Sequence, residues 1–281
     1  MEYQREEGDL DPVYAGKTAG NEDRGGARGR SALGGHPNQE RGDRGDRADA
    51  RAGHRSKGNV LVRVEANMKS AYEYHLLGMM GDKIGEGIPV FTGLPKVITP
   101  EALRNLGAQL NTSGAYGMYH IVGFTPEAPT LEAAFGGKKP EREVVITDQD
   151  LKDFEGKFCD ETHDGKVDFA MFGCPHFTLE EAKYIAEHIE GKKLAIPMYI
   201  LVSSHALQMA ERMGVNDILT AAGAELISDS CPDQPCWHYL KGMVGITESP
   251  KCAYYPRRRG INFVIRDLDT CIEAALTGEV K

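Results

Sequence analysis

Residues 167–181, VDFAMFGCPHFTLEE, decide the fold of this chain. The apolar run at 167–172 predicts a buried strand, and Thr178 and Glu181 have the spacing of a capping box, which starts a helix. Cys174 is therefore expected between the carboxyl end of a strand and the amino end of a helix. The amide dipoles of such a position favour a thiolate, the form of cysteine that binds a metal or attacks an electrophile. We expect Cys174 to be the chemical centre of the protein.

The rest of the chain beyond residue 144 alternates between strand and helix patterns. The predicted strands are 167–172, 194–202, 224–229, 243–247 and 261–266, and the predicted helices are 179–190, 204–213, 216–222 and 267–277. Such alternation predicts βαβ units, so the fold class is α/β with mostly parallel sheets and flanking helices. Upstream, we expect a strand at 60–66, helices at 70–80 and 100–110, a loop at 81–87 and a small-residue turn at 112–117.

Composition excludes several classes of partner. The chain has 281 residues, a net charge of −9 and six cysteines. The negative charge argues against binding nucleic acid or an anionic membrane, and no apolar run approaches membrane-spanning length. Six cysteines are too few for the disulfide framework of a small secreted domain. We therefore expect a cytoplasmic protein whose thiols serve metal binding, catalysis or core packing.

Residues 1–58 differ from the remainder. They hold 12 of the 33 glycines and nine arginines, with little apolar periodicity. Such a segment buries too little apolar surface to offset the entropy of ordering it, which predicts a disordered tail. A second hypothesis is translation out of frame, because codons can be chosen for residues 36–46 that encode an ordinary folded segment when read one base later. The expected organisation is a tail at 1–58 and an α/β region at 59–281, with a sub-boundary near 140–165.

The residues that follow the predicted strands carry most of the reactive side chains. Parallel strands place their carboxyl ends at one edge of a sheet, where α/β proteins bind ligands. Cys174 and Cys231 each follow a predicted strand and each precede a proline, 57 residues apart. Two thiolates from different strands, with a third donor, could hold zinc or an iron–sulfur cluster. Inert buried cysteine is the common alternative, and both interpretations stay open.

The other candidate side chains have simpler explanations. His176 and His205 also follow strands, but a lone histidine more often packs or caps than binds a metal. Cys236 lies close to Cys231 and is a reserve ligand. Lys251 is ordinarily a solvated charge, and its interest comes from its place after a strand. The remaining cysteines are expected to be structural: Cys159, Cys252 and Cys271.

A series of ordered motifs resembles the aconitase X family. They are KIGEGIPVF at 83–91, SGA at 113–115, HIVGFTPEA at 120–128, GCPHFTLEE at 173–181, DSCP at 229–232 and SPKCAYY at 249–255. The resemblance runs from about residue 59 to the C-terminus and implies an iron–sulfur hydro-lyase with aconitase-like three-layer α/β domains.

The resemblance also implies an activity. Archaeal members pair a large subunit with a small swivelling subunit and dehydrate mevalonate 5-phosphate to anhydromevalonate phosphate in the mevalonate pathway. Bacterial relatives dehydrate cis-3-hydroxyproline. The family's [4Fe–4S] cluster has three cysteine ligands, of which two correspond to Cys174 and Cys231, and its substrate-contacting lysine corresponds to Lys251. We expect this chain to be such a large subunit, in a heterodimer with the small one.

The chain departs from the family pattern in its N-terminal part. The family's first cysteine ligand lies upstream of the position of Val60, and this chain has no cysteine before Cys159. An alternative function is therefore a non-catalytic α/β binding module, or a degenerate, cluster-free member of the family. A third hypothesis, a hydrolase using Cys174 and His176, has no evident acid to orient the histidine. The catalytic base is not identified by the sequence.

Overall fold

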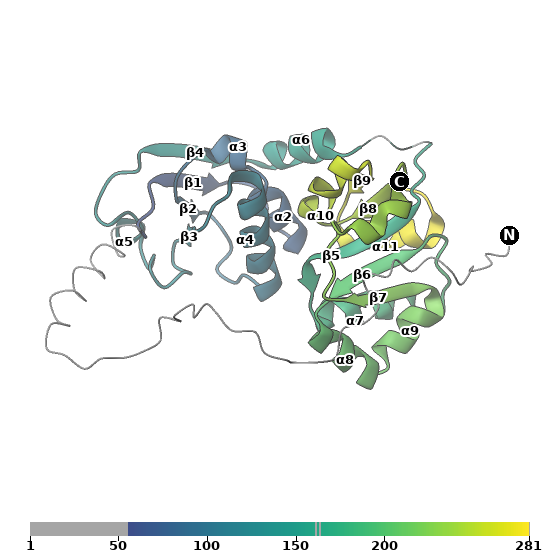
Figure 1. Cartoon of the computed structure of the whole chain (residues 1–281). Helices are drawn as coiled ribbons and strands as arrows, with labels where there is room; N and C mark the ends of the chain where they lie inside the picture. The colour runs from purple at the N-terminus through teal and green to yellow at the C-terminus, as the bar shows by residue number, and fades with distance from the viewer. Residues whose placement is uncertain (1–55, 161, 163, 281) are drawn as a thin grey trace, which may run out of the picture. The chain divides into compact units, whose positions relative to one another are not determined.

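The computed structural model describes residues 56–160, 162 and 164–280. The predicted tail at 1–58 lies outside the described residues, apart from its last three, so its disorder or frame error stays a prediction. The described residues belong to one unit of the chain and form two parallel sheets with their helices (Figure 1). None of the described helices is both long enough and apolar enough to cross a membrane.

The first sheet has four strands in the order β3-β2-β1-β4, and each neighbouring pair is parallel. The strands are β1 (Val60–Val64), β2 (Pro89–Thr92), β3 (His120–Ile121) and β4 (Arg142–Ile146). The helices of this part are α2 (Ala71–Gly78), α3 (Gly81–Ile84), α4 (Pro100–Gly114), α5 (Leu131–Phe135) and α6 (Asp148–Phe158). Helix α2 packs closely on α4, because Gly78 has no Cβ to collide with the Leu106 carbonyl.

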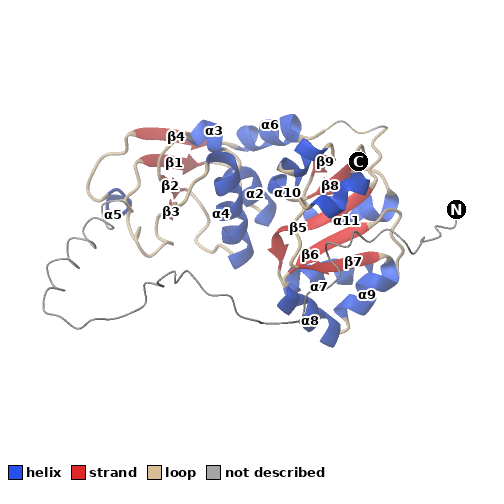
Figure 2. Ribbon diagram, viewed as in Figure 1, coloured by secondary structure: helices blue, strands red, loops and turns tan. Residues whose placement is uncertain are grey.

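The second sheet has five strands in the order β7-β6-β5-β8-β9, again all parallel (Figure 2). The strands are β5 (Phe169–Phe177), β6 (Met198–Val202), β7 (Ala224–Ser228), β8 (Val244–Thr247) and β9 (Asn262–Ile265). The helices are α7 (Leu179–Ile189), α8 (Ser204–Arg212), α9 (Val215–Ala222), α10 (Pro250–Tyr254) and α11 (Leu268–Thr277), with 3₁₀ helices η1 (Pro235–Leu240) and η2 (Pro256–Arg259). The predicted α/β class with mostly parallel sheets is confirmed.

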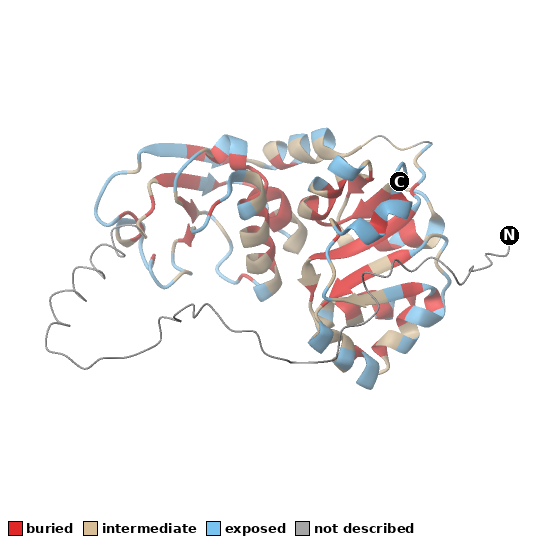
Figure 3. Ribbon diagram, in the orientation of Figure 1, coloured by how far each residue is buried: buried red, intermediate tan, exposed pale blue. Residues whose placement is uncertain are grey.

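Strand β5 is buried on both faces, which explains its nearly continuous apolar sequence. Figure 3 shows β5 mainly in the colour of buried residues. Phe169 and Met171 pack into a core shared with α2, α4 and α10, whereas Ala170 and Phe172 pack into a core shared with α7, α9 and α11. The second sheet is therefore the middle of three layers. The predicted site residues lie near the carboxyl ends of its strands, at one edge of the sheet.

The prediction that β5 ends at residue 172 is wrong, because the strand continues to Phe177. Its pairing with β6 shifts register between Phe172 and Phe177. Gly173 stands at the shift with φ +93°, a backbone conformation that favours glycine. The irregularity places Cys174 inside the strand rather than beyond its end.

Helix α4 also runs further than the sequence predicts, through Thr112 and Ser113 to Gly114, where a turn was expected. Both hydroxyls find acceptors in the helical state. Thr112 donates to the Ala108 carbonyl at 3.0 Å, and Ser113 donates to the Gly78 carbonyl of α2 at 2.7 Å. Contacts between helices thus outweigh the local preference of these residues for turns.

Candidate functional site at the carboxyl edge of the second sheet

Cys174 is held in place by its backbone neighbours. A Cβ on Gly173 would stand 2.0 Å from the Leu201 carbonyl oxygen, so this close approach of β5 to β6 requires glycine. On the other side, the Ser249 hydroxyl donates a hydrogen bond to the Cys174 carbonyl. The Cys174 side chain is only 8% exposed.

The Cys174 thiol lies in an electrostatic setting that includes two other predicted site residues. Burial raises its pKa to about 12, the Lys251 ammonium opposes this shift, and Cys231 and Glu248 add to it. The sequence predicts that helix dipoles stabilise a thiolate here, and this prediction is wrong. Burial has the largest effect on the pKa of Cys174 and favours the neutral thiol, and α7 begins only at Leu179, five residues later. Lys251 and Cys231 both contribute to the electrostatic field at the Cys174 thiol.

Cys231 follows β7 and is exposed. Its sulfur accepts a hydrogen bond from the Asp233 amide at 3.5 Å, and its carbonyl accepts one from the Trp237 indole at 2.9 Å. His176 is tied to the same loop, since its Nε2 lies 2.7 Å from the Ser230 carbonyl oxygen. His176 therefore links the strand of Cys174 to the loop of Cys231.

Lys251 is the second residue of the short helix α10, which Ser249 caps by accepting the Cys252 amide at 3.3 Å. The Lys251 ammonium lies 3.5 Å from the Ala108 carbonyl of α4. A cation in this position can attract an anionic ligand to the edge where Cys174 lies.

The other candidates are either exposed or packed in the core, and burial, with smaller contributions from Cys174 and Cys231, raises the pKa of Cys252. His205 is exposed on α8, and Cys236 is exposed on η1. Cys252 and Cys271 are completely buried, and Cys159 accepts hydrogen bonds from the Ile265 amide and the Arg266 guanidinium at 3.4 and 3.3 Å. These environments suit cysteines that pack or stabilise the fold.

The chemistry of the Cys174 and Cys231 thiols fits a thiophilic metal or an iron–sulfur cluster. Across residues 56–160, 162 and 164–280, no three histidine, cysteine or carboxylate side chains gather closely enough to hold a metal ion. A metal held by Cys174 and Cys231 would therefore need a further donor from outside the described residues.

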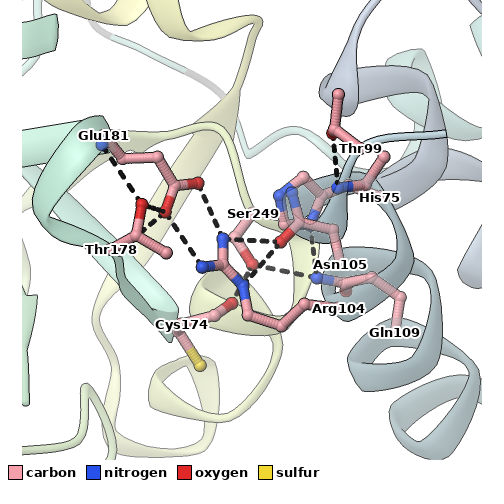
Figure 4. A network of polar contacts seen from close by, with 10 residues as sticks. His75, Thr99, Arg104, Asn105, Gln109, Cys174, Thr178, Glu181 and Ser249 are labelled. Atoms are coloured by element: carbon pink, nitrogen blue, oxygen red, sulfur yellow. Dashed lines mark hydrogen bonds and ion pairs between the residues drawn. The ribbon is translucent and has the colours of Figure 1, made fainter.

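A buried polar network behind Cys174 was not evident from the sequence (Figure 4). The Gln109 amide nitrogen lies 3.0 Å from the Ser249 hydroxyl and 2.7 Å from Nδ1 of His75. Burial, assisted by the Arg104 charge, lowers the pKa of His75 to about 3, so the ring is neutral. The network connects α2 and α4 to the edge of the second sheet.

Arg104 makes a second connection between α4 and this edge. Its guanidinium binds both carboxylate oxygens of Glu181, at 2.7 and 2.9 Å, and also contacts the Asn105 side-chain oxygen (Figure 4). Glu181 at the same time completes the capping box with Thr178. The predicted capping box of Thr178 and Glu181 is confirmed. The ion pair of Glu181 with Arg104 was not predicted, because the two residues lie 77 positions apart in the sequence.

Glu248 is a buried carboxyl group between Thr247 and Ser249. Burial raises its pKa to about 8, Glu181 contributes to the rise, and Arg104 opposes it. Glu248 also lines a cavity of about 720 Å³. The other carboxylates along this cavity belong to Glu73, Glu101, Glu180, Glu181, Asp267 and Asp269.

The acidic lining of the cavity has a structural explanation. Glu73, Glu101, Glu180 and Asp269 stand in the first turns of α2, α4, α7 and α11, where negative charge stabilises the helix dipole. The same charges repel an anion. An anionic ligand would therefore favour the edge near Lys251 over this cavity.

The fold and this edge define a class of protein: a parallel-sheet α/β protein with thiols at the ends of two strands. Comparison with known sequences specifies the class. The model of the "Aconitase X second domain" matches residues 58–155, and that of the "Aconitase X third domain" matches residues 167–277. The chain belongs to the aconitase X family.

Individual relatives agree with this assignment. The chain is 33% identical to the phosphomevalonate dehydratase large subunit of Thermococcus kodakarensis, over 78% of this chain and 55% of the relative. It is 31% identical to the cis-3-hydroxy-L-proline dehydratase of Pseudomonas aeruginosa, over 78% of this chain and 39% of the relative. The crystal structure of Thermococcus kodakaraensis aconitase X in its holo-form superposes with a TM-score of 0.70 at 31% identity, covering 78% and 55% of the two chains. The chain thus spans about half the length of the curated relatives it matches.

Proposed function

We propose that this chain is a large-subunit component of a dehydratase that removes water from a small hydroxy acid, with mevalonate 5-phosphate as the substrate and anhydromevalonate phosphate as the product. The observation that supports the proposal is that Cys174 lies toward the carboxyl end of β5 while Cys231 and Lys251 follow β7 and β8 of the same parallel sheet, in a chain of the aconitase X family. Relatives named phosphomevalonate dehydratase large subunit support this substrate and a small-subunit partner.

Cys174 and Cys231 would hold an iron–sulfur cluster, which we propose is [4Fe–4S]. When bound, the cluster supplies a Lewis acid for the leaving hydroxyl group. Lys251 would bind the carboxylate or phosphate of the substrate, and the Ala108 carbonyl would orient its ammonium group. The third ligand and the proton-abstracting base are proposed to come from outside the two matched segments.

The test is dehydration by the anaerobically reconstituted chain together with a small subunit of the family. Mevalonate 5-phosphate should lose water, which nuclear magnetic resonance detects as a new alkene signal, and Lys251→Met should raise KM more than it lowers kcat. The control is Lys192→Met, whose ammonium contacts the His188 carbonyl on the exposed surface of α7. Failure to dehydrate mevalonate 5-phosphate, with turnover of cis-3-hydroxyproline, would contradict the proposed substrate.

A second candidate function is a cluster-free binding module. One observation favours it: among the described residues, no three metal-binding side chains gather closely enough to hold a metal ion. A colourless, iron-free protein after reconstitution, with no turnover of either hydroxy acid, would support this alternative and contradict the dehydratase.

A further inference from the structure

We propose that Gln109 is a positioning residue for Cys174: its amide holds the Ser249 hydroxyl, which in turn holds the backbone carbonyl of Cys174. The proposal rests on the metal-binding role proposed for Cys174. Helix α4, which belongs to the helices of the first sheet, would thus fix the Cys174 segment of strand β5 in the second sheet.

The hydrogen-bond directions in this chain of contacts are determined by chemistry. The Ser249 hydroxyl lies within bonding reach of a carbonyl oxygen, which can only accept, so the serine hydrogen goes to Cys174. Gln109 must then donate to the Ser249 oxygen, at 3.0 Å. Its second amide hydrogen goes to Nδ1 of His75 at 2.7 Å, which fixes which way the amide faces.

Burial makes this arrangement rigid and costly to disturb. Gln109 and Ser249 are 0% exposed and His75 is 2% exposed, so water cannot replace a lost partner. The side-chain amide oxygen of Gln109, Oε1, is buried without a hydrogen-bond partner among the described residues. Packing alone would favour an apolar side chain here, because an unpaired buried oxygen destabilises the fold. The amide is therefore better explained by its contact with Ser249.

The neighbouring residue of α4 contributes to the same edge. The Ala108 carbonyl accepts from the Lys251 ammonium at 3.5 Å, one residue before Gln109. A single turn of α4 thus contacts both the residue that holds Cys174 and the proposed substrate-binding lysine. Partners behind a metal ligand orient it, and their loss typically weakens metal affinity about 10- to 100-fold.

The test uses three variants of the full chain. Gln109→Met keeps the length of the side chain and removes its amide, and Ser249→Ala removes the next link. Tyr119→Phe is the matched control, because it removes a hydrogen bond to the Leu103 carbonyl of the same helix and touches neither Gln109 nor the Ala108 carbonyl that holds Lys251. The probe is Co²⁺ under anaerobic conditions, followed by its thiolate charge-transfer absorption, with the Cys174→Ala variant defining the Cys174-dependent signal.

We expect Gln109→Met and Ser249→Ala each to weaken Cys174-dependent Co²⁺ binding by about 10-fold or more, and the double variant to be no weaker than the worse single one, because the two residues act in series. Tyr119→Phe should bind as the unsubstituted chain does. Unchanged Co²⁺ affinity in Gln109→Met overturns the proposal. So does an equal loss in Tyr119→Phe, since that would reflect general loosening of α4.

A second readout separates this proposal from the proposed function. The rate at which iodoacetamide alkylates Cys174, mapped by mass spectrometry, should rise several-fold in Gln109→Met and Ser249→Ala and stay unchanged in Tyr119→Phe. If the unsubstituted chain shows no Cys174-dependent Co²⁺ signal, the metal role fails, and the alkylation rates alone decide the positioning role. Equal alkylation rates in all variants overturn it.

Discussion

Gly173 brings the backbone of β5 so close to β6 that a side chain cannot be accommodated. Two features act together: its φ is +93°, and an added Cβ would stand only 2.0 Å from the Leu201 carbonyl oxygen. We predict that Gly173→Ala lowers the free energy of unfolding by about 3 kcal/mol or more, because it adds a backbone collision to an unfavourable φ. Denaturant unfolding would measure the loss.

Gly191 provides the matched control for this substitution. It also has a positive φ, +72°, but a Cβ there would meet no atom within 4 Å. Gly191→Ala should cost only about 1 kcal/mol. Equal losses in the two variants would show that the approach of β5 to β6 is less restrictive than the structure indicates.

The raised pKa of Glu248 predicts that the stability of the protein depends on pH. Its pKa is raised from 4.5 to about 8 in the folded protein, so the folded state keeps a proton that the unfolded chain releases. The free energy of unfolding should therefore fall as pH rises from about 4.5 to about 8 and level off above that. Glu248→Gln has no carboxyl group to titrate and removes this effect. The free energy of unfolding of the variant minus that of the unsubstituted chain should therefore rise between pH 4.5 and about 8, by on the order of a few kcal/mol. Parallel stability curves for the two proteins between these pH values would contradict the assignment.

Helix α4 joins the two sheets through charged as well as neutral contacts. The Arg104–Glu181 pair is mostly shielded, with side-chain exposures of 26% and 16%, whereas the Arg63–Glu143 pair on the first sheet is 54% and 46% exposed. Arg104→Met should lower stability by about 2 to 3 kcal/mol, because Glu181 loses its partner close to the buried Glu248. Arg63→Met should cost less than about 1 kcal/mol. Thermal and denaturant unfolding of the two variants would show whether shielding makes this difference.

Local signals account for the elements that the sequence predicts correctly. The Thr178–Glu181 capping box starts α7, and the Thr99-Pro100 step starts α4. Short elements such as β2, β4 and α10 carry too few residues for a periodic pattern. The length of β5 depends on its pairing with β6, which sequence periodicity does not contain.

The candidate site divides in the same way. Cys174, Cys231 and Lys251 could be selected from the sequence because each follows a predicted strand. The contact between His75 and Gln109 joins residues 34 positions apart, and that between Gln109 and Ser249 joins residues 140 positions apart. No local pattern in the sequence indicates either contact. The pKa of Cys174 could not be predicted either, because it depends on how deeply β5 is buried.

At the scale of the whole molecule, charge separates the proposed site from the acidic cavity. A substrate with carboxylate and phosphate groups would be repelled by the carboxylates around Glu248 and attracted by Lys251. The proposed substrate would therefore bind at the edge where the two thiols lie. The acidic lining of the cavity is explained by carboxylates that stabilise the starts of helices.

The proposed cluster site at Cys174 and Cys231 can be tested most directly by the iron and acid-labile sulfide content of the anaerobically reconstituted chain, beside Cys174→Ala, Cys231→Ala and the buried control Cys271→Ala. We expect a brown protein that contains iron and sulfide, loss of both in the Cys174 and Cys231 variants, and retention in the Cys271 variant. Iron and sulfide that persist without Cys174 and Cys231, or an unsubstituted chain that takes up neither, would contradict the proposal.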